Sequence, residues 1–65
     1  MVIKGSKGFI FIERLSPPTG KGLGLHEMVA YSGTENKPTG LLGFGRYRTG
    51  EGGKKLMTKL RKLIG

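Results

Sequence analysis

The 65-residue sequence contains no cysteine and no tryptophan, and it has only four acidic residues and one histidine. Without cysteine, the chain forms neither a disulfide nor a thiolate metal site. His26 has no second ligand in a metal-binding spacing and no serine or aspartate pattern that would complete a catalytic triad. We therefore expect no enzyme activity, no cofactor and no metal site. His26 is interpreted as a loop-to-strand junction residue or as a contact to a phosphate or base.

Long apolar runs are also absent. No stretch approaches the roughly 20 apolar residues that a membrane span needs, and the N-terminus MVIKGSKG lacks the apolar centre of a secretory signal. A chain of this length predicts one small domain over residues 1–65, with no second domain. Because so short a chain buries only about 60% of its unfolded surface, we expect marginal stability that a bound partner increases.

Positive charge is what the sequence has in excess: twelve Lys and Arg against four acids, a net charge of +8. Residues 40–65 carry seven basic residues and one acid, whereas residues 1–39 carry five and three. Charge this uneven indicates a polyanionic partner, either nucleic acid or an anionic membrane surface.

Strand-forming residues dominate the first two thirds of the chain. Residues 1–4 and 9–12 are apolar runs joined by a glycine-containing link, which predicts a β-hairpin with Lys7 at its tip. Residues 28–31 predict a further strand. Between these strands, SPPTGKGLGL (16–25) is typical of a loop and lacks the spacing of a phosphate-binding P-loop around Gly20, Lys21 and Gly22, so we expect no nucleotide site.

The stretch GLLGFGRYR (40–48) predicts the next strand, antiparallel to 28–31. Glycine weakens a strand, so its repetition here suggests the close approach of a ligand or another backbone. Alternation along a strand predicts that Phe44, Arg46 and Arg48 lie on one face. Core packing is the expected role of Phe44 and Tyr47, with stacking on bases as the alternative.

The apolar period changes from Lys54 onward. Leucine, methionine and isoleucine at 56, 57, 60, 63 and 64 form one helical stripe, with lysine and arginine on the remaining positions. The helix is predicted to begin at Thr49 or Glu51. The elements predict a two-layer α+β domain, either β–β–loop–β–β–α or β–β–β–α with the loop interrupting one strand.

Four motifs resemble the small-subunit ribosomal protein five family, in the same order. The segment GLLGFGRYRTGE (40–51) is similar to its G-x-V-G-F-G-x-G-K-A-x-E signature. KGSKG (4–8) resembles its K-G-G hairpin, FIF (9–11) its F-x-F strand, and MVAYSG (28–33) its A-L-V-x-V-G segment. The chain departs from the family at Tyr47, Arg48 and Thr49, where the family has glycine, lysine and alanine. Residues 13–27 resemble an insertion, and the family's second domain is missing.

The resemblance implies a double-stranded-RNA-binding-like fold: a three-stranded antiparallel sheet with one C-terminal helix, and a long loop over residues 13–27 interrupting the second strand. It implies a divergent or reduced structural constituent of the small ribosomal subunit, mitochondrial or otherwise cytoplasmic. Such a protein binds ribosomal RNA near the messenger entry side, supports assembly and decoding, and neighbours ribosomal proteins four and eight.

The residues predicted to bind RNA are basic and lie on the hairpin tip, the glycine-rich strand and the helix: Lys7, Arg46, Arg48, Lys54, Lys55 and Lys59. The alternative function is a membrane-active cationic amphipathic protein, since KKLMTKLRKLIG (54–65) places lysines opposite an apolar stripe.

Overall fold

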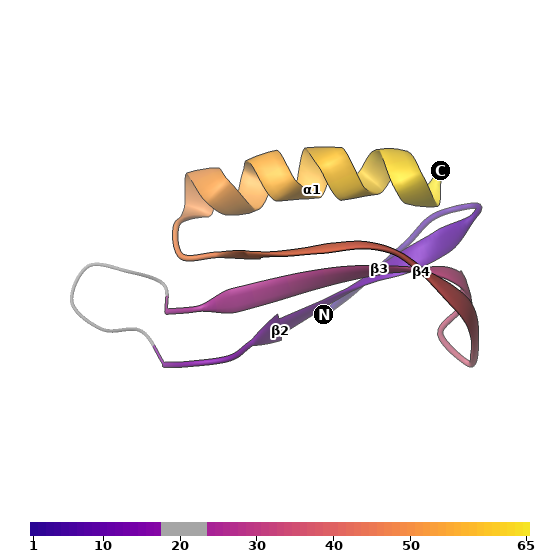
Figure 1. Ribbon diagram of the computed structural model, residues 1–65, viewed down its shortest axis with the longest axis horizontal. Coiled ribbons are helices and arrows are strands. Elements are labelled where there is room, and N and C mark those ends of the chain that lie inside the picture. The colour runs from indigo at the N-terminus through magenta and orange to yellow at the C-terminus, as the bar shows by residue number, and fades with distance from the viewer. Residues whose placement is uncertain (18–23) are drawn as a thin grey trace.

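The computed structural model describes residues 1–17 and 24–65, which form four strands followed by one helix. The strands are β1 (Val2–Lys4), β2 (Gly8–Arg14), β3 (His26–Thr34) and β4 (Lys37–Tyr47), and the helix is α1 (Gly50–Ile64). The helix forms one layer and the sheet the other (Figure 1). The predicted α+β architecture, an antiparallel sheet with a C-terminal helix, is confirmed.

The four strands form one antiparallel sheet in the order β1-β2-β3-β4. The three-stranded sheet that the family resemblance implies is therefore wrong. Residues 2–4 form a strand of their own, because a tight turn in which the Gly5 amide donates to the Gly8 carbonyl at 2.8 Å lets them pair with residues 9–11. The predicted antiparallel pairing of residues 28–31 with the glycine-rich strand is confirmed, as in the pair Val29–Phe44.

Residues 13–27 do not interrupt a strand, which corrects a second expectation. β2 ends at Arg14 and β3 begins at His26, and these two residues face each other across adjacent strands. The ends of this segment belong to β2 and β3, and the stretch between Arg14 and His26 connects two neighbouring antiparallel strands. The Leu15 amide donates to the Leu25 carbonyl at 2.7 Å, which joins the two ends of this connection. The Gly20–Lys21–Gly22 stretch considered for phosphate binding lies outside the described residues.

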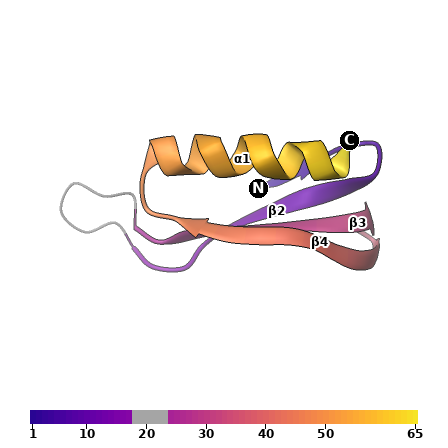
Figure 2. The same ribbon diagram turned by 45° about the horizontal axis from the view of Figure 1, so that its top comes forward.

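The apolar side of α1 packs along the sheet, and its axis follows the strands (Figure 2). Thr49 caps the helix: its backbone is extended, and its side-chain oxygen accepts from the Gly52 amide at 3.0 Å. The core joins helix and sheet through five buried residues, namely Ile10, Met28, Ala30, Leu60 and Ile64.

Two glycines of β4 face the helix and allow it to lie close. A Cβ added to Gly45 would lie 2.7 Å from a Leu56 methyl, and one added to Gly43 would lie 3.0 Å from a Leu63 methyl. The repeated glycine predicted that some group lies close to this strand, and the structure confirms it. The approaching groups are leucines of the chain's own helix, and not a ligand or a second backbone.

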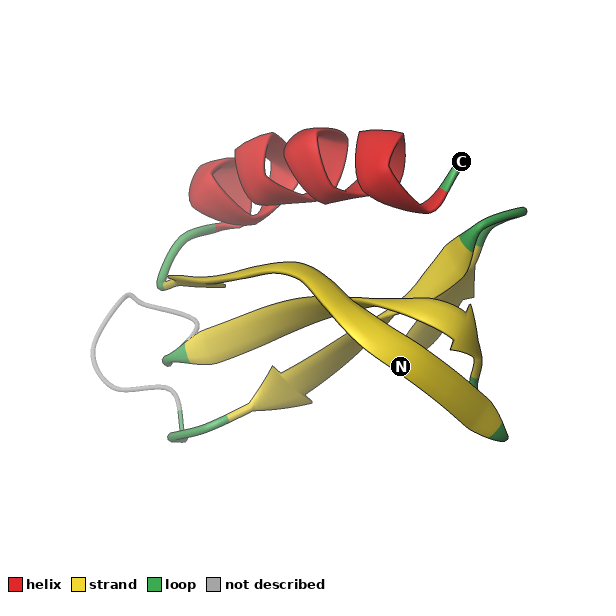
Figure 3. Cartoon of the chain, turned by 45° about the vertical axis from the view of Figure 1, so that its right-hand side comes forward, coloured by secondary structure: helices red, strands yellow, loops and turns green. Residues whose placement is uncertain are grey.

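The opposite face of the sheet, here called the open face, is covered by no described element (Figure 3). Phe11 and Phe44 lie on it and remain 43% and 66% exposed, one on either side of Val29 in the sheet. Glu27 and Arg46 form the next cross-strand pair on the same face.

Candidate nucleic-acid interface

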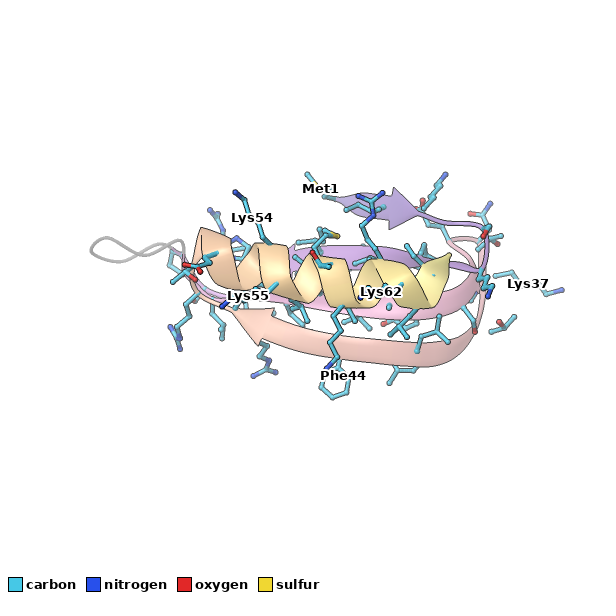
Figure 4. All side chains as sticks on the ribbon, turned by 90° about the horizontal axis from the view of Figure 1, so that it is seen from above. Met1, Lys37, Phe44, Lys54, Lys55 and Lys62 are labelled. Carbon is cyan, nitrogen blue, oxygen red and sulfur yellow. The ribbon has the colours of Figure 1, made fainter. Side chains whose placement is uncertain are left out.

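The surface of α1 that points away from the sheet is basic. Leu60 and Ile64 turn inward and are almost fully buried, so the 3.6-residue period leaves the intervening positions outside. The exposed cations of the helix are Lys54, Lys55, Lys59, Arg61 and Lys62. Figure 4 shows Lys54, Lys55 and Lys62 on the side of the molecule that the helix occupies. The arrangement presents several positive charges along one 15-residue element.

Few of these charges are compensated. All four acidic residues lie in the described part of the chain, and three of them form ion pairs: with Lys4 (3.5 Å), Arg46 (3.0 Å) and Lys55 (3.8 Å). On the helix, the remaining cations have no described carboxylate within 4.0 Å: Lys54, Lys59, Arg61 and Lys62. Their attraction for an external anion is therefore undiminished by internal pairing.

Arg46 does not belong to this surface. It lies on the open face, opposite the helix, and its Nε donates to a carboxylate oxygen of its cross-strand neighbour Glu27 at 3.0 Å. The predicted shared face holds for Phe44 and Arg46. Arg48 follows the end of β4 at Tyr47, so strand alternation does not place it with them.

Lys7 lies in the turn between β1 and β2, as predicted. Its backbone amide donates to the Ile64 carbonyl at 2.7 Å, which places it at the C-terminal end of α1. Of the six predicted residues, the structure brings Lys54, Lys55 and Lys59 together on the helix and sets Lys7 beyond its far end. Arg61 and Lys62 also occupy this helix. These two were not among the predicted RNA-binding residues, although the sequence already placed them among the basic positions of the predicted helix.

The aromatic residues divide between core and surface. Tyr47 packs against the core and stacks on His26 with ring centroids 5.1 Å apart, so its predicted packing role is confirmed. Phe44 is 66% exposed. The prediction that it packs in the core is wrong, because its side of β4 has no described covering layer.

His26 is the first residue of β3, which confirms the prediction that it lies where a loop joins a strand. Its buried Nδ1 has no hydrogen-bond partner among the described residues.

Two kinds of feature were compared with the described residues: metal-binding clusters and membrane-spanning helices. No three His, Asp or Glu side chains there gather where they could hold a metal ion. Among residues 1–17 and 24–65, no helix combines the length and apolar character needed to cross a membrane.

Comparison with protein-family models, curated proteins and solved structures finds no match to this chain. The resemblance to the ribosomal family therefore stays a prediction that depends on the order of the four motifs.

Proposed function

We propose that this protein binds structured RNA through the exposed side of α1. The observation that carries the proposal is the row of helical cations without carboxylate partners: Lys54, Lys59, Arg61 and Lys62. Lysine and arginine that neutralise phosphates release condensed counterions, which makes binding strong at low salt and weak at high salt.

The sheet supplies rigidity for this surface. Gly53 near the start of α1 and Leu60 and Ile64 near its end are buried, so the sheet holds the helix at both ends and fixes the backbone that carries the outer side chains. Structured RNA is recognised mainly by shape and by its phosphates and ribose hydroxyls. We therefore expect the basic helix to contact phosphates and ribose hydroxyls, and not to recognise a specific base sequence.

The ribosomal assignment is part of the same proposal. Small size, net charge of +8 and the ordered motif matches support a structural constituent of the small ribosomal subunit, either mitochondrial or cytoplasmic. In that setting the partners are ribosomal RNA and neighbouring proteins, with ribosomal proteins four and eight as the candidates. Assembly on RNA would also raise the stability of a small domain by mass action.

A membrane-active function requires a different arrangement of α1. Its apolar stripe packs on the sheet, and the buried Leu60 and Ile64 would have to leave the core to enter a bilayer. Helix undocking would cost the buried contacts that define the fold. We therefore favour RNA over the anionic membrane surface.

The deciding experiment measures binding of the whole chain to a structured RNA, with duplex DNA and anionic vesicles as competitors, over a salt series. RNA preferred at every salt concentration, with log-linear weakening as salt rises, supports the proposal. Vesicles that displace RNA, together with leakage caused by the whole chain, would refute it in favour of membrane activity.

A further inference from the structure

A groove of about 580 Å³ runs between α1 and the sheet. Its floor and walls are apolar and come from three strands and the helix, while two cations stand at its rim. The residues that matter are Ile12, Met28, Tyr47 and Met57 for the apolar part and Lys54 and Arg61 for the rim. Figure 4 shows Lys54 projecting on the side of the helix nearer to Met1, whereas Phe44 lies on the other side, beyond β4.

The groove exists because neither neighbouring element fills it. On one side Ile12 pairs with Met28 of β3, and on the other it lies just beyond the β1 pairing: Val2 pairs with Phe11, and the Ile12 amide donates to the Met1 carbonyl at 3.0 Å. On the helix, Gly50 contributes no side chain, and a Cβ built there meets nothing within 4 Å. At the edge of the β1 pairing and beside the glycine-rich first turn, Ile12 and Met57 remain partly exposed, whereas Met28 is buried.

The rim defines the charge of the ligand. Lys54 and Arg61 are seven residues apart, so they lie on the same side of the helix about 10 Å apart along its axis. Neither has a described carboxylate within 4.0 Å. Pockets of this size commonly combine an apolar lining with a few charged groups that orient the ligand, and methionine adapts its shape to flat or irregular groups. The lining suits an apolar or weakly polar group, and the two rim cations suit anionic groups attached to it.

We propose that the groove takes one unpaired nucleotide of the bound RNA, with its base against Ile12 and Met57, close to the buried Met28, and its flanking phosphates at Lys54 and Arg61. The inference rests on the proposed RNA binding and adds a preference to it. In a continuous duplex the bases stay stacked and paired, and only phosphates reach the helix. An unpaired nucleotide can turn its base out of the stack, so RNA with a bulge gains a contact that the duplex lacks.

The test compares the affinities of two hairpin RNAs that differ only by one unpaired nucleotide, and 2-aminopurine at that nucleotide in the bulged RNA reports the surroundings of its base by fluorescence. We expect the bulged RNA to bind about tenfold more tightly, near the lower end of what stacking of one base on an aromatic side chain contributes, with Tyr47 as the aromatic residue of the groove. In ¹³C-methyl NMR spectra of the whole protein, the bulged RNA should shift the Met28 and Met57 methyl signals, and the duplex should leave them nearly unchanged.

Three variants locate the effect. Gly50→Leu should narrow the groove without crowding the core and abolish the preference for the bulge while leaving duplex affinity intact. The double variant Lys54→Gln with Arg61→Gln should reduce the preference to less than about twofold. The matched control, Lys59→Gln with Lys62→Gln, removes two cations that likewise lack a described carboxylate partner, but from the outward side, and should weaken both RNAs alike, so that the tenfold preference remains.

The outcomes separate the two proposals. Equal affinity for both hairpins, or Gly50→Leu with an undiminished preference, would overturn the groove assignment and leave RNA binding standing. Binding to neither RNA would overturn both. Methyl shifts produced by anionic vesicles and not by the bulged RNA would overturn the assignment in favour of an amphiphile.

Discussion

Replacing Lys59 and Lys62 by glutamine should halve the salt dependence of RNA binding. Both side chains lie on the exposed part of α1, and neither has a carboxylate partner among the described residues. Glutamine keeps most of the side-chain length and a good helix propensity, so the change removes charge and leaves the fold in place.

The magnitude follows from counting the unpaired cations of the helix. Four such cations, Lys54, Lys59, Arg61 and Lys62, predict a slope of log K against log salt of about −3.6, using ~0.9 per phosphate contact in a duplex. Between 50 and 200 mM salt, the affinity of the unmodified protein should then fall about 150-fold. With two cations removed, the slope should be about −1.8 and the fall only about 12-fold.

The assay is a fluorescence-anisotropy titration of one structured RNA at five or more salt concentrations between these limits. The control is Lys37→Gln with Arg46→Gln, which removes the same net charge from β4. Lys37 projects from the end of the β3–β4 hairpin in Figure 4, and Arg46 lies on the open face, paired with Glu27. We expect the slope of this control to stay within about 0.5 of the unmodified value, because a single phosphate contact changes it by ~0.9.

A control slope that falls as much as that of the helix variant would refute the assignment of the site to α1. Binding would then respond to the total charge of +8 wherever it lies. The assignment to α1 would also be refuted if the helix variant kept both the salt dependence and the affinity of the unmodified protein. Lys59 and Lys62 would then not contact phosphates.

Three further predictions concern stability, each measured by denaturant unfolding. Leu60→Ala should cost about 2–5 kcal/mol, a large part of the ~3–10 kcal/mol expected for this length, whereas Leu63→Ala should cost much less because Leu63 is 39% exposed against 1% for Leu60. Equal losses would mean that the helix does not pack as described. Thr49→Ala should cost about 1 kcal/mol through loss of the cap, with Thr49→Asp retaining stability; loss in both variants would contradict a capping role. Gly8→Ala should cost about 3 kcal/mol, since its Cβ would collide with the Tyr31 carbonyl oxygen, and a stable variant would show that the two strands are further apart.

Local signals predicted the local structure well. The period of the apolar residues after Lys54 predicted the helix, and Thr49 was one of its two predicted starts. Alternating apolar residues and turn glycines predicted the first hairpin and the position of Lys7 at its tip. These features depend on neighbours within a few residues, so they can be inferred without knowing the tertiary arrangement.

The errors arose where one element's environment depends on a distant one. The exposure of Phe44 depends on the absence of a described layer over the open face, and nothing within residues 40–48 specifies that absence. The same limit applies to Arg46, whose partner Glu27 is nineteen residues away and became a neighbour only through the register of β3 with β4. The strand count was set by a family resemblance, whereas the hairpin prediction already contained the additional strand.

The glycine-rich strand shows how a correct local inference can lead to the wrong site. Glycine at 43 and 45 indicated the close approach of a ligand or another backbone, and Arg46 and Arg48 of the same stretch were predicted to bind RNA. In the structure, the space above these glycines is occupied by Leu56 and Leu63. Close approach brings the helix down onto β4, and it is this docking that holds the helical lysines outward on a rigid support. The glycines therefore serve the proposed interface indirectly: they position the basic helix, and the helix carries the charges that would meet RNA.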